Sequence, residues 1–385
     1  MKLFHHRPRK FAMMVGSVMF CLLLVACGSA NTGSSGGTTP TTSIVNGKGC
    51  MKVGVLLPET ATSARWDGVD RPQLETLIPQ LLPGATVDYA NAQGNADTQQ
   101  TQAQAALTKG DCILVIAPSD SIKAAAIVSA AKAKSVPVIS YDRLIYSNDL
   151  NYYVSFDGVA VGNLQGTYVA QHYQSFVSAN GTKNTVVING AQTDNNALLF
   201  AKGAHNALDP LFTSGALKKV YEKFTPDWNN ATAQTEMQAA LTANQNKVAI
   251  AYVANDGMAN NVIAALKAVQ LNGKVLVTGQ DATVAGIHNI LKGDQAMTVY
   301  KAIPKEAMAT AQLVAALSKG TDTSTLTNGV TTTVPITGGA AIPSILETPV
   351  AVDKTNIQST VIADGFVKVS DICAGLPSGT GGICP

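Results

Sequence analysis

Charged residues are scarce in this sequence. Lys, Arg, Asp and Glu make up 14% of its 385 residues, and the formal net charge is only +2. Proteins that bind nucleic acid or strongly charged ligands usually carry an excess of one sign, so we expect neither kind of partner. Aromatic residues are also few, at 5%, and two of them are tryptophans, Trp66 and Trp228. This composition favours a neutral ligand.

The sequence after residue 50 also lacks the short motifs of common catalytic and metal sites. It contains no Gly-x-x-x-x-Gly-Lys phosphate loop, no Gly-x-Ser-x-Gly nucleophile turn and no His-Glu-x-x-His zinc motif. No Cys-x-x-Cys occurs, and His172, His205 and His288 are widely spaced. We therefore expect no metal site, no cofactor and no catalysis, and we expect the three histidines on helix surfaces.

The amino terminus has the pattern of an export signal. Residues 1–10 are basic, residues 11–26 are mostly apolar, and Cys27 follows. The apolar run is too short to favour a membrane-spanning helix, so residues 1–26 are predicted to be a signal peptide. Residues 24–27, Leu-Val-Ala-Cys, resemble a bacterial lipobox, in which the cysteine becomes the first residue and receives lipid. We expect a lipid anchor at Cys27 and an extracytoplasmic, membrane-attached protein; an ordinary signal peptide with an incidental cysteine is the alternative.

A flexible tether is predicted next. Residues 28–49 are dominated by Gly, Ser, Thr, Asn and Pro and show no apolar periodicity, so they cannot bury enough apolar surface to fold. With the lipidated Cys27 they form a predicted segment of residues 27–49, and the folded body is expected to begin near Cys50. A transcription regulator would need a helix-turn-helix in this position, which the tether excludes.

Four cysteines remain in the body, an even number that suits disulfides in an exported protein. Cys50 and Cys112 each stand just before an apolar run typical of a strand. If these strands are parallel neighbours, the two cysteines start level and can form a bridge. Cys373 and Cys384 would close a small loop near the carboxyl terminus.

The body alternates between strands and helices, a pattern that predicts a parallel sheet with right-handed crossovers. In residues 50–156 the predicted strands are 53–57, 86–89, 113–117, 136–140 and 152–156, and the predicted helices are 72–82, 98–108 and 121–133. Residues 157–298 repeat the pattern, with strands 185–189, 219–223, 248–253 and 275–278 and helices 161–172, 197–207, 231–243, 260–271 and 282–291, and a further strand at 297–300 is predicted in the less regular part that follows. We therefore predict an α/β fold of two doubly wound lobes joined by a multi-strand hinge.

The remaining residues are less regular. A helix at 303–317 is predicted to return to the first lobe within residues 299–322, residues 323–370 are assigned to the second lobe, and 371–385 form a tail. Two lobes of this kind place two sets of strand ends opposite each other, and a cleft between lobes is a preferred ligand site.

Polar clusters follow four of the predicted strands. They are Asp142-Arg143, Asp194-Asn195-Asn196, Asn255-Asp256 and Gln280-Asp281. Ligands of α/β sheets bind outside the carboxyl ends of the strands, so these clusters are expected to face one shared ligand. Their mixture of hydrogen-bond donors and acceptors suits a neutral molecule with many hydroxyl groups, which a sugar provides. Helix capping is the alternative for Asn255, Asp256 and Asp281, and we assign Asn255 to the ligand and Asp256 to the backbone.

Nine short pieces of the chain form an ordered set: Arg65-Trp66, 91–95, 141–145, 153–157, 194–197, 241–244, Asn255-Asp256, 279–282 and 298–301. Together they resemble the periplasmic sugar-binding proteins of ATP-driven (ABC) importers, and among them the D-xylose-binding branch, over roughly residues 52–367. The resemblance implies a type I periplasmic binding protein that closes on one pyranose and presents it to an ABC permease. One departure concerns residues 199–202, Leu-Phe-Ala-Lys, where related xylose binders tend to carry Arg after Leu-Phe.

The resemblance also assigns roles to residues. Trp66 and Trp228 are expected to sandwich the sugar ring, whose faces carry hydrogens that suit a broad apolar surface. The expected polar contacts to the ligand are Arg65, Asp142, Arg143, Asn196, Asn255, Asp281 and Lys301. Asp194 is expected either to contact the ligand directly or to support residues that do. The protein is expected to be a monomer that binds a monosaccharide, D-xylose first among the candidates.

Two alternatives of another class stay open at this point. An exported sugar-processing enzyme would need a pair of carboxylates across the sugar, for which Asp142 and Asp281 are candidates. A sugar-sensing receptor for chemotaxis or signalling would use the same closed lobes against a different membrane partner.

Overall fold

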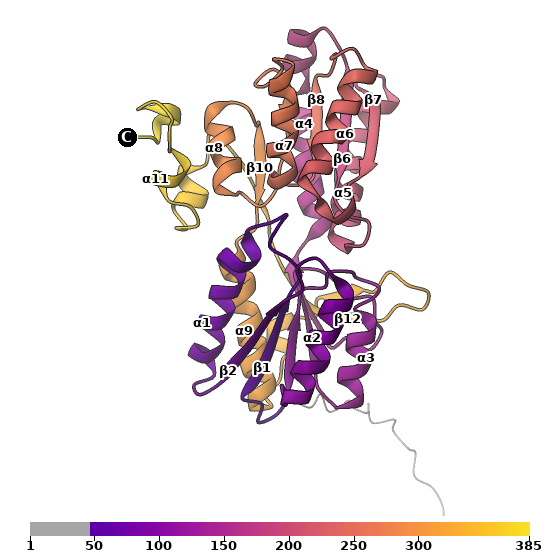
Figure 1. Ribbon diagram of the computed structural model, residues 1–385, viewed down its shortest axis with the longest axis vertical. Coiled ribbons are helices and arrows are strands. Elements are labelled where there is room, and N and C mark those ends of the chain that lie inside the picture. The colour runs from indigo at the N-terminus through magenta and orange to yellow at the C-terminus, as the bar shows by residue number, and fades with distance from the viewer. Residues whose placement is uncertain (1–46) are drawn as a thin grey trace, which may run out of the picture. The chain divides into compact units, whose positions relative to one another are not determined.

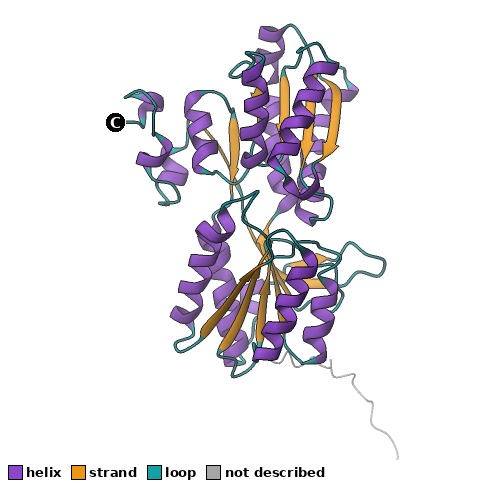
Figure 2. Cartoon of the chain, viewed as in Figure 1, coloured by secondary structure: helices purple, strands orange, loops and turns teal. Residues whose placement is uncertain are grey.

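A computed structural model describes residues 47–385. The predicted signal peptide, the lipidation site Cys27 and most of the predicted tether lie outside these residues. The described chain forms two α/β lobes, and Figure 2 shows helices flanking the strands of each. Within the described residues, no helix is both long and apolar enough to cross a membrane.

The first lobe contains a seven-stranded sheet in the order β11-β12-β5-β4-β3-β1-β2 (Figure 1). All pairs are parallel except β11 with β12. The strands are β1 (Lys52–Leu57), β2 (Thr86–Asn91), β3 (Ile113–Ile116), β4 (Val138–Tyr141), β5 (Tyr152–Phe156), β11 (Thr331–Thr333) and β12 (Ala341–Glu347). Its helices are α1 (Arg71–Leu81), α2 (Ala96–Lys109), α3 (Ala125–Ala133), α9 (Ile303–Lys319) and the short α10 (Ser324–Thr327), with a π-helical turn η1 (Trp66–Asp70) after β1.

The second lobe contains a parallel sheet in the order β7-β6-β8-β9 and a separate antiparallel pair, β10 with β13. Its strands are β6 (Asn184–Asn189), β7 (Lys218–Phe224), β8 (Ile250–Val253), β9 (Leu276–Val277), β10 (Met297–Tyr300) and β13 (Val350–Asp353). Its longer helices are α4 (Gly158–Asn180), α5 (Asn195–Thr213), α6 (Asn230–Ala243), α7 (Asp256–Ala268) and α8 (Val284–Lys292). Four short helices complete it: η2 (Pro226–Trp228), η3 (Gln358–Ile362), α11 (Val369–Ile372) and η4 (Thr380–Gly382).

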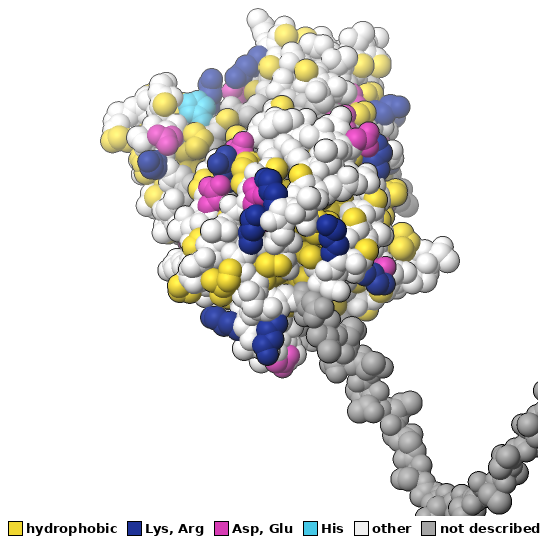
Figure 3. Space-filling view, turned by 60° about the horizontal axis from the view of Figure 1, so that its bottom comes forward, with side chains coloured by type: hydrophobic (Ala, Val, Ile, Leu, Met, Phe, Trp, Pro, Cys, Tyr) yellow, Lys and Arg dark blue, Asp and Glu magenta, His cyan; other side chains and the backbone are white. Residues whose placement is uncertain are grey.

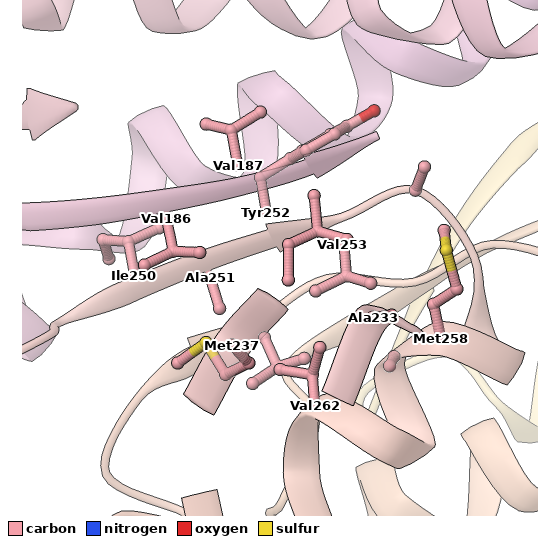
Figure 4. Close-up of a cluster of buried hydrophobic side chains, with 14 of the residues drawn as sticks. Val186, Val187, Ala233, Met237, Ile250, Ala251, Tyr252, Val253, Met258 and Val262 are labelled. Atoms are coloured by element: carbon pink, nitrogen blue, oxygen red, sulfur yellow. The ribbon is translucent and has the colours of Figure 1, made fainter. Parts of the chain in front are cut away.

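The core of the second lobe explains why its strands read as continuous apolar runs. Val186 and Val187 of β6 and Ile250 to Val253 of β8 are buried, and Figure 4 shows Met237 of α6 and Val262 of α7 packed against these strands. A parallel sheet that is covered on both faces needs apolar residues at successive positions. The helices α4 and α5 pack so closely that a Cβ on Gly162 would lie 1.9 Å from the Phe200 carbonyl oxygen. This packing fixes the start of α5, where Asp194, Asn196 and Phe200 lie.

The chain crosses between the lobes three times, which confirms the multi-strand hinge. The crossings are β5 to α4 at residues 156–158, β10 to α9 at residues 300–303, and β12 to β13 at residues 347–350. Each crossing joins the end of a paired strand to the other lobe, so the strand ends of both lobes face the hinge region.

Three predicted boundaries are wrong. Residues 323–347 were assigned to the second lobe, but β12 pairs with β5 from Ser344↔Tyr153 to Glu347↔Phe156, which places β11 and β12 in the first sheet. The tether was predicted to extend to residue 49, yet Gly47 is buried and the Gly49 amide donates to the Ser318 carbonyl at 2.7 Å. Residues 371–385 were predicted to be a tail, but Ile372, Cys373 and Cys384 pack with Ile287 and Ile290 of α8.

Both predicted disulfides are present, Cys50–Cys112 and Cys373–Cys384. The first bridge joins the starts of the neighbouring parallel strands β1 and β3, which pair from Val53↔Ile113. The two cysteines are not level in this register, because Cys112 immediately precedes Ile113 and Cys50 lies three residues before Val53. On the face shown in Figure 3, basic and acidic side chains are interspersed, as the small net charge predicts.

Candidate functional site

One cavity brings together all ten predicted ligand-binding residues. Its empty space, counted out to the mouth, is about 340 Å³. The predicted residues that line it are Arg65, Trp66, Asp142, Arg143, Asp194, Asn196, Trp228, Asn255, Asp281 and Lys301. They come from the segments that follow β1, β4, β6, β7, β8, β9 and β10, so both lobes contribute.

Asp142 is the centre of the polar network in this cavity. Its Oδ2 accepts hydrogen bonds from Arg65 Nη1 at 2.8 Å and from Lys301 Nζ at 2.9 Å, and its Oδ1 accepts from Asn196 Nδ2 at 3.1 Å. Burial acts to raise the pKa of Asp142, but the positive charges of Arg65 and Lys301 outweigh burial and hold this pKa well below its ordinary value. Asp142 is therefore a permanent carboxylate and hydrogen-bond acceptor.

Arg65 is held from behind by two further carboxyl groups. Its Nε and Nη2 donate to Asp70 at 2.9 and 2.6 Å, and Nη2 also donates to Glu306 Oε2 at 3.2 Å. Asp70 and Glu306 are both fully buried. A guanidinium has five N–H groups, and these contacts with the one to Asp142 use four of them. Arg65 thus retains a single N–H, on Nη1, for a ligand.

A second group joins Arg143, Asp194 and Trp228. Asp194 Oδ2 accepts from Arg143 Nε at 2.9 Å and from Trp228 Nε1 at 3.1 Å. Asp194 Oδ1 accepts from the Asn196 backbone amide at 2.9 Å and so caps α5. Burial raises the pKa of Asp194, and the charge of Arg143 opposes this rise. Because both oxygens of Asp194 are occupied, this residue orients Arg143 and Trp228.

The two tryptophans differ in their surroundings. The guanidinium carbons of Arg65 and Arg143 lie 4.5 and 5.2 Å from the centre of the Trp66 ring. Trp228 packs edge-on against Phe200, with ring centroids 6.3 Å apart, and a Cβ on Gly190 would lie 2.2 Å from its ring. Both indoles line the cavity, and their sandwiching of a sugar ring stays a prediction.

The capping alternatives are resolved by hydrogen bonds. Asn255 Oδ1 accepts from the Met258 amide at 2.9 Å and caps α7, while the side chain still lines the cavity. Thr283, and not Asp281, caps α8. Asp256 accepts from the Thr283 amide at 2.8 Å, whereas the residue that caps α7 is Asn255, which was assigned to the ligand. Burial raises the pKa of Asp256 to about 7, although hydrogen bonds from Gln295 and Thr283 oppose the rise.

Three site residues have left-handed backbone conformations that side chains other than glycine seldom adopt. The φ angles are +57° at Asp142, +54° at Trp228 and +99° at Asp281. Such conformations cost on the order of 1–3 kcal/mol each and tend to cluster at functional sites. Each lies just beyond a strand and turns its side chain into the cavity.

Three residues that line the cavity and two that support it were not predicted from the sequence. The lining residues are Thr62, Ser63 and Phe200, and the supporting residues are Asp70 and Glu306. Gln280 also lines the cavity, and it belongs to a cluster that was expected to face the ligand. Nothing in the sequence near Glu306, in the first turn of α9, signals that its carboxyl group reaches Arg65.

The charges in the cavity wall balance. Arg65, Arg143 and Lys301 oppose Asp142, Asp194 and Asp281, so the formal charge of the wall is zero. A wall of this kind offers strong hydrogen bonds to hydroxyl groups without attracting a charged ligand.

Comparisons with known proteins agree with this geometry. A family model described as "Periplasmic binding protein domain" matches residues 55–322. The D-xylose-binding periplasmic protein of Haemophilus influenzae is 39% identical over 286 residues, which cover 74% of this chain and 81% of that protein. The D-xylose-binding periplasmic protein of Escherichia coli is 37% identical over 292 residues, which cover 75% and 84%.

A solved structure has the same fold. It is an ABC transporter solute binding protein from Clostridium phytofermentans with bound β-D-glucose, and it is 30% identical with a TM-score of 0.72. The match covers 83% of this chain and 99% of that one. The chain therefore belongs to the periplasmic binding protein family, a family of non-enzymatic receptors, within the branch that contains the D-xylose-binding proteins.

Proposed function

We propose that this protein is the lipid-anchored substrate-binding protein of an ABC sugar importer and that it binds a monosaccharide, first D-xylose, in the described cavity. The single observation that carries the ligand class is the charge-balanced wall around Asp142. Its carboxylates and its cations supply acceptors and donors for hydroxyl groups, and Trp66 and Trp228 add apolar surface. The names of the curated relatives support D-xylose in particular.

The ligand is expected to favour closure of the lobes. Asp142 belongs to the first lobe and Asn196 to the second, so a sugar that contacts both gains contacts that only the closed arrangement offers. The closed form is then the one that a permease receives. The predicted anchor at Cys27 would keep the receptor at the membrane that holds the permease.

The carboxyl pair considered for an enzyme does not suit hydrolysis. A general acid must keep a proton near neutral pH, whereas the pKa of Asp142 is far below its usual range. Asp142 and Asp281 also share the same two cations, since Asp281 Oδ1 lies 4.0 Å from both Arg65 Nη1 and Lys301 Nζ. This arrangement favours hydrogen bonding over proton transfer.

Calorimetric titration with D-xylose, D-glucose, L-arabinose, D-ribose and D-galactose tests the proposal. We expect tight binding of one or two of these sugars, D-xylose among them, and no product by chromatography. If none of the five sugars binds, the proposed ligand class is wrong.

A further inference from the structure

A second hollow adjoins the sugar cavity and shares part of its wall. Its empty space, counted out to the mouth, is about 310 Å³, and we call it the outer compartment. Arg143, Asp194 and Trp228 line both spaces, so the group held together by Asp194 Oδ2 forms a partition between them. Gly94, in the loop after β2, and Ser119, in the loop after β3, line the outer compartment. No residue of these two loops lines the sugar cavity.

The outer compartment has unused hydrogen-bonding capacity. Glu59, in the loop after β1, is 7% exposed, and its Oε2 accepts from the Thr62 amide at 2.8 Å. Its Oε1 is buried and has no hydrogen-bond partner among the described residues. A buried carboxylate oxygen without a partner costs free energy, and a hydroxyl group from a ligand would supply the missing donor.

The charges around the outer compartment select against anions. Glu59, Asp194 and Asp227 contribute three carboxyl groups, and Arg143 is the one cation among the lining residues. A phosphate or a uronic acid would meet like charges there, at a considerable cost. A neutral unit with hydroxyl groups would meet acceptors, together with the apolar indole of Trp228.

We propose that the outer compartment binds a second neutral sugar unit, so that the protein accepts a disaccharide as well as the monosaccharide. This inference rests on the proposed function, because one unit of the disaccharide occupies the cavity around Asp142. Because Arg143, Asp194 and Trp228 separate the two spaces, the proposal requires these side chains to move apart around the glycosidic linkage, and the second unit donates a hydroxyl to Glu59. Either unit of a disaccharide, the reducing or the non-reducing one, can enter the cavity around Asp142, so one ligand tests both orientations.

The experiment is calorimetry on the exported protein with two matched pairs, D-xylose with β-1,4-xylobiose and D-glucose with cellobiose. We expect at least one disaccharide to bind within tenfold of its monosaccharide. Thr193 is exposed and lines the outer compartment, so Thr193→Trp should fill it. That variant should weaken disaccharide binding at least tenfold and change monosaccharide binding less than twofold. Glu59→Gln should weaken disaccharide binding about fivefold.

Gln192→Trp is the matched control, because Gln192 is also exposed but does not line the outer compartment. It should leave both affinities unchanged. The inference is wrong if a monosaccharide binds and neither disaccharide does, or if Thr193→Trp weakens both ligands equally. If only a disaccharide binds and Thr193→Trp abolishes this binding, the result supports a sugar site in the outer compartment and refutes the proposal that the ligand is a monosaccharide. If all four sugars fail to bind, the disaccharide inference is wrong, and the proposed function is then decided by the titrations with L-arabinose, D-ribose and D-galactose.

Discussion

Lys301 Nζ donates to Asp142 Oδ2 at 2.9 Å, and both side chains are buried. Asp142 follows β4 of the first lobe, and Lys301 stands at the crossing between β10 and α9. The contact therefore ties the floor of the cavity to a hinge segment. Any movement of the hinge changes the surroundings of the carboxylate that the ligand is expected to contact.

Asp142→Asn should lower both stability and ligand binding. The change leaves the buried cations Arg65 and Lys301 without their shared carboxylate, and breaking a buried ion pair on one side typically costs about 3–5 kcal/mol. Urea unfolding should show this loss, with Asp149→Asn as the control. Asp149 pairs with Lys132 at the exposed surface, so its removal should cost less than about 1 kcal/mol. Equal losses in the two variants would contradict the central role of Asp142.

Gly190→Ala should weaken sugar binding although Gly190 is not expected to touch the sugar. The new methyl group would lie 2.2 Å from the Trp228 ring and would force the indole to move. The effect should have the direction of Trp228→Ala, which we expect to cost about 2–3 kcal/mol of binding free energy, and should be smaller. Gly68→Ala is the control, since nothing lies within 4 Å of a Cβ there. Calorimetry that finds Gly190→Ala as tight as wild type would show that the position of Trp228 is unimportant.

Stability should depend on pH through Asp256. In the folded state the pKa of Asp256 is raised to about 7, whereas the pKa of an aspartate in the unfolded chain is about 3.9. Between these values the folded state binds more protons than the unfolded state, so this contribution to the free energy of unfolding falls as pH rises and levels off above pH 7. The variant Asp256→Asn lacks this titrating group. The free energy of unfolding of the wild type relative to this variant should therefore decrease by a few kcal/mol between about pH 4 and 7. A constant difference would refute the shifted pKa.

Loss of the Cys50–Cys112 disulfide should destabilise the protein more than loss of Cys373–Cys384. The sequence separations are 62 and 11 residues, and a longer closed loop restricts the unfolded chain more. We expect about 4 kcal/mol for the first bridge and somewhat under 3 kcal/mol for the second. Thermal unfolding of the two paired Cys→Ser variants gives the comparison, and the reverse order would contradict this account.

The sequence predicts the fold well where one rule decides the outcome. Alternating apolar runs and helical segments placed nearly every strand and helix through α9, because parallel strands buried on both faces have a strong pattern. The pattern fails after Lys319. The strand β11 consists of only three threonines, and β12 contains Pro343, which is unusual inside a strand. Only the pairing of β12 with β5, far away in the sequence, determines the lobe of these two strands.

The site was predictable for a related reason. Asp142, Asn255 and Asp281 follow strands, and the topology brings strand ends together. Asp70 and Glu306 were not predictable, since each lies in a helical segment and reaches Arg65 only after packing. The outer compartment likewise depends on loops whose paths no local pattern specifies.

Tryptophan fluorescence tests the central claim most directly. The chain has two tryptophans, and both line the cavity, so the emission of the protein reports on this site. D-Xylose should change the emission and saturate it with the Kd measured by calorimetry, and Trp228→Phe should remove much of the change. Binding by calorimetry without any change in emission would place the sugar outside the cavity and contradict the account.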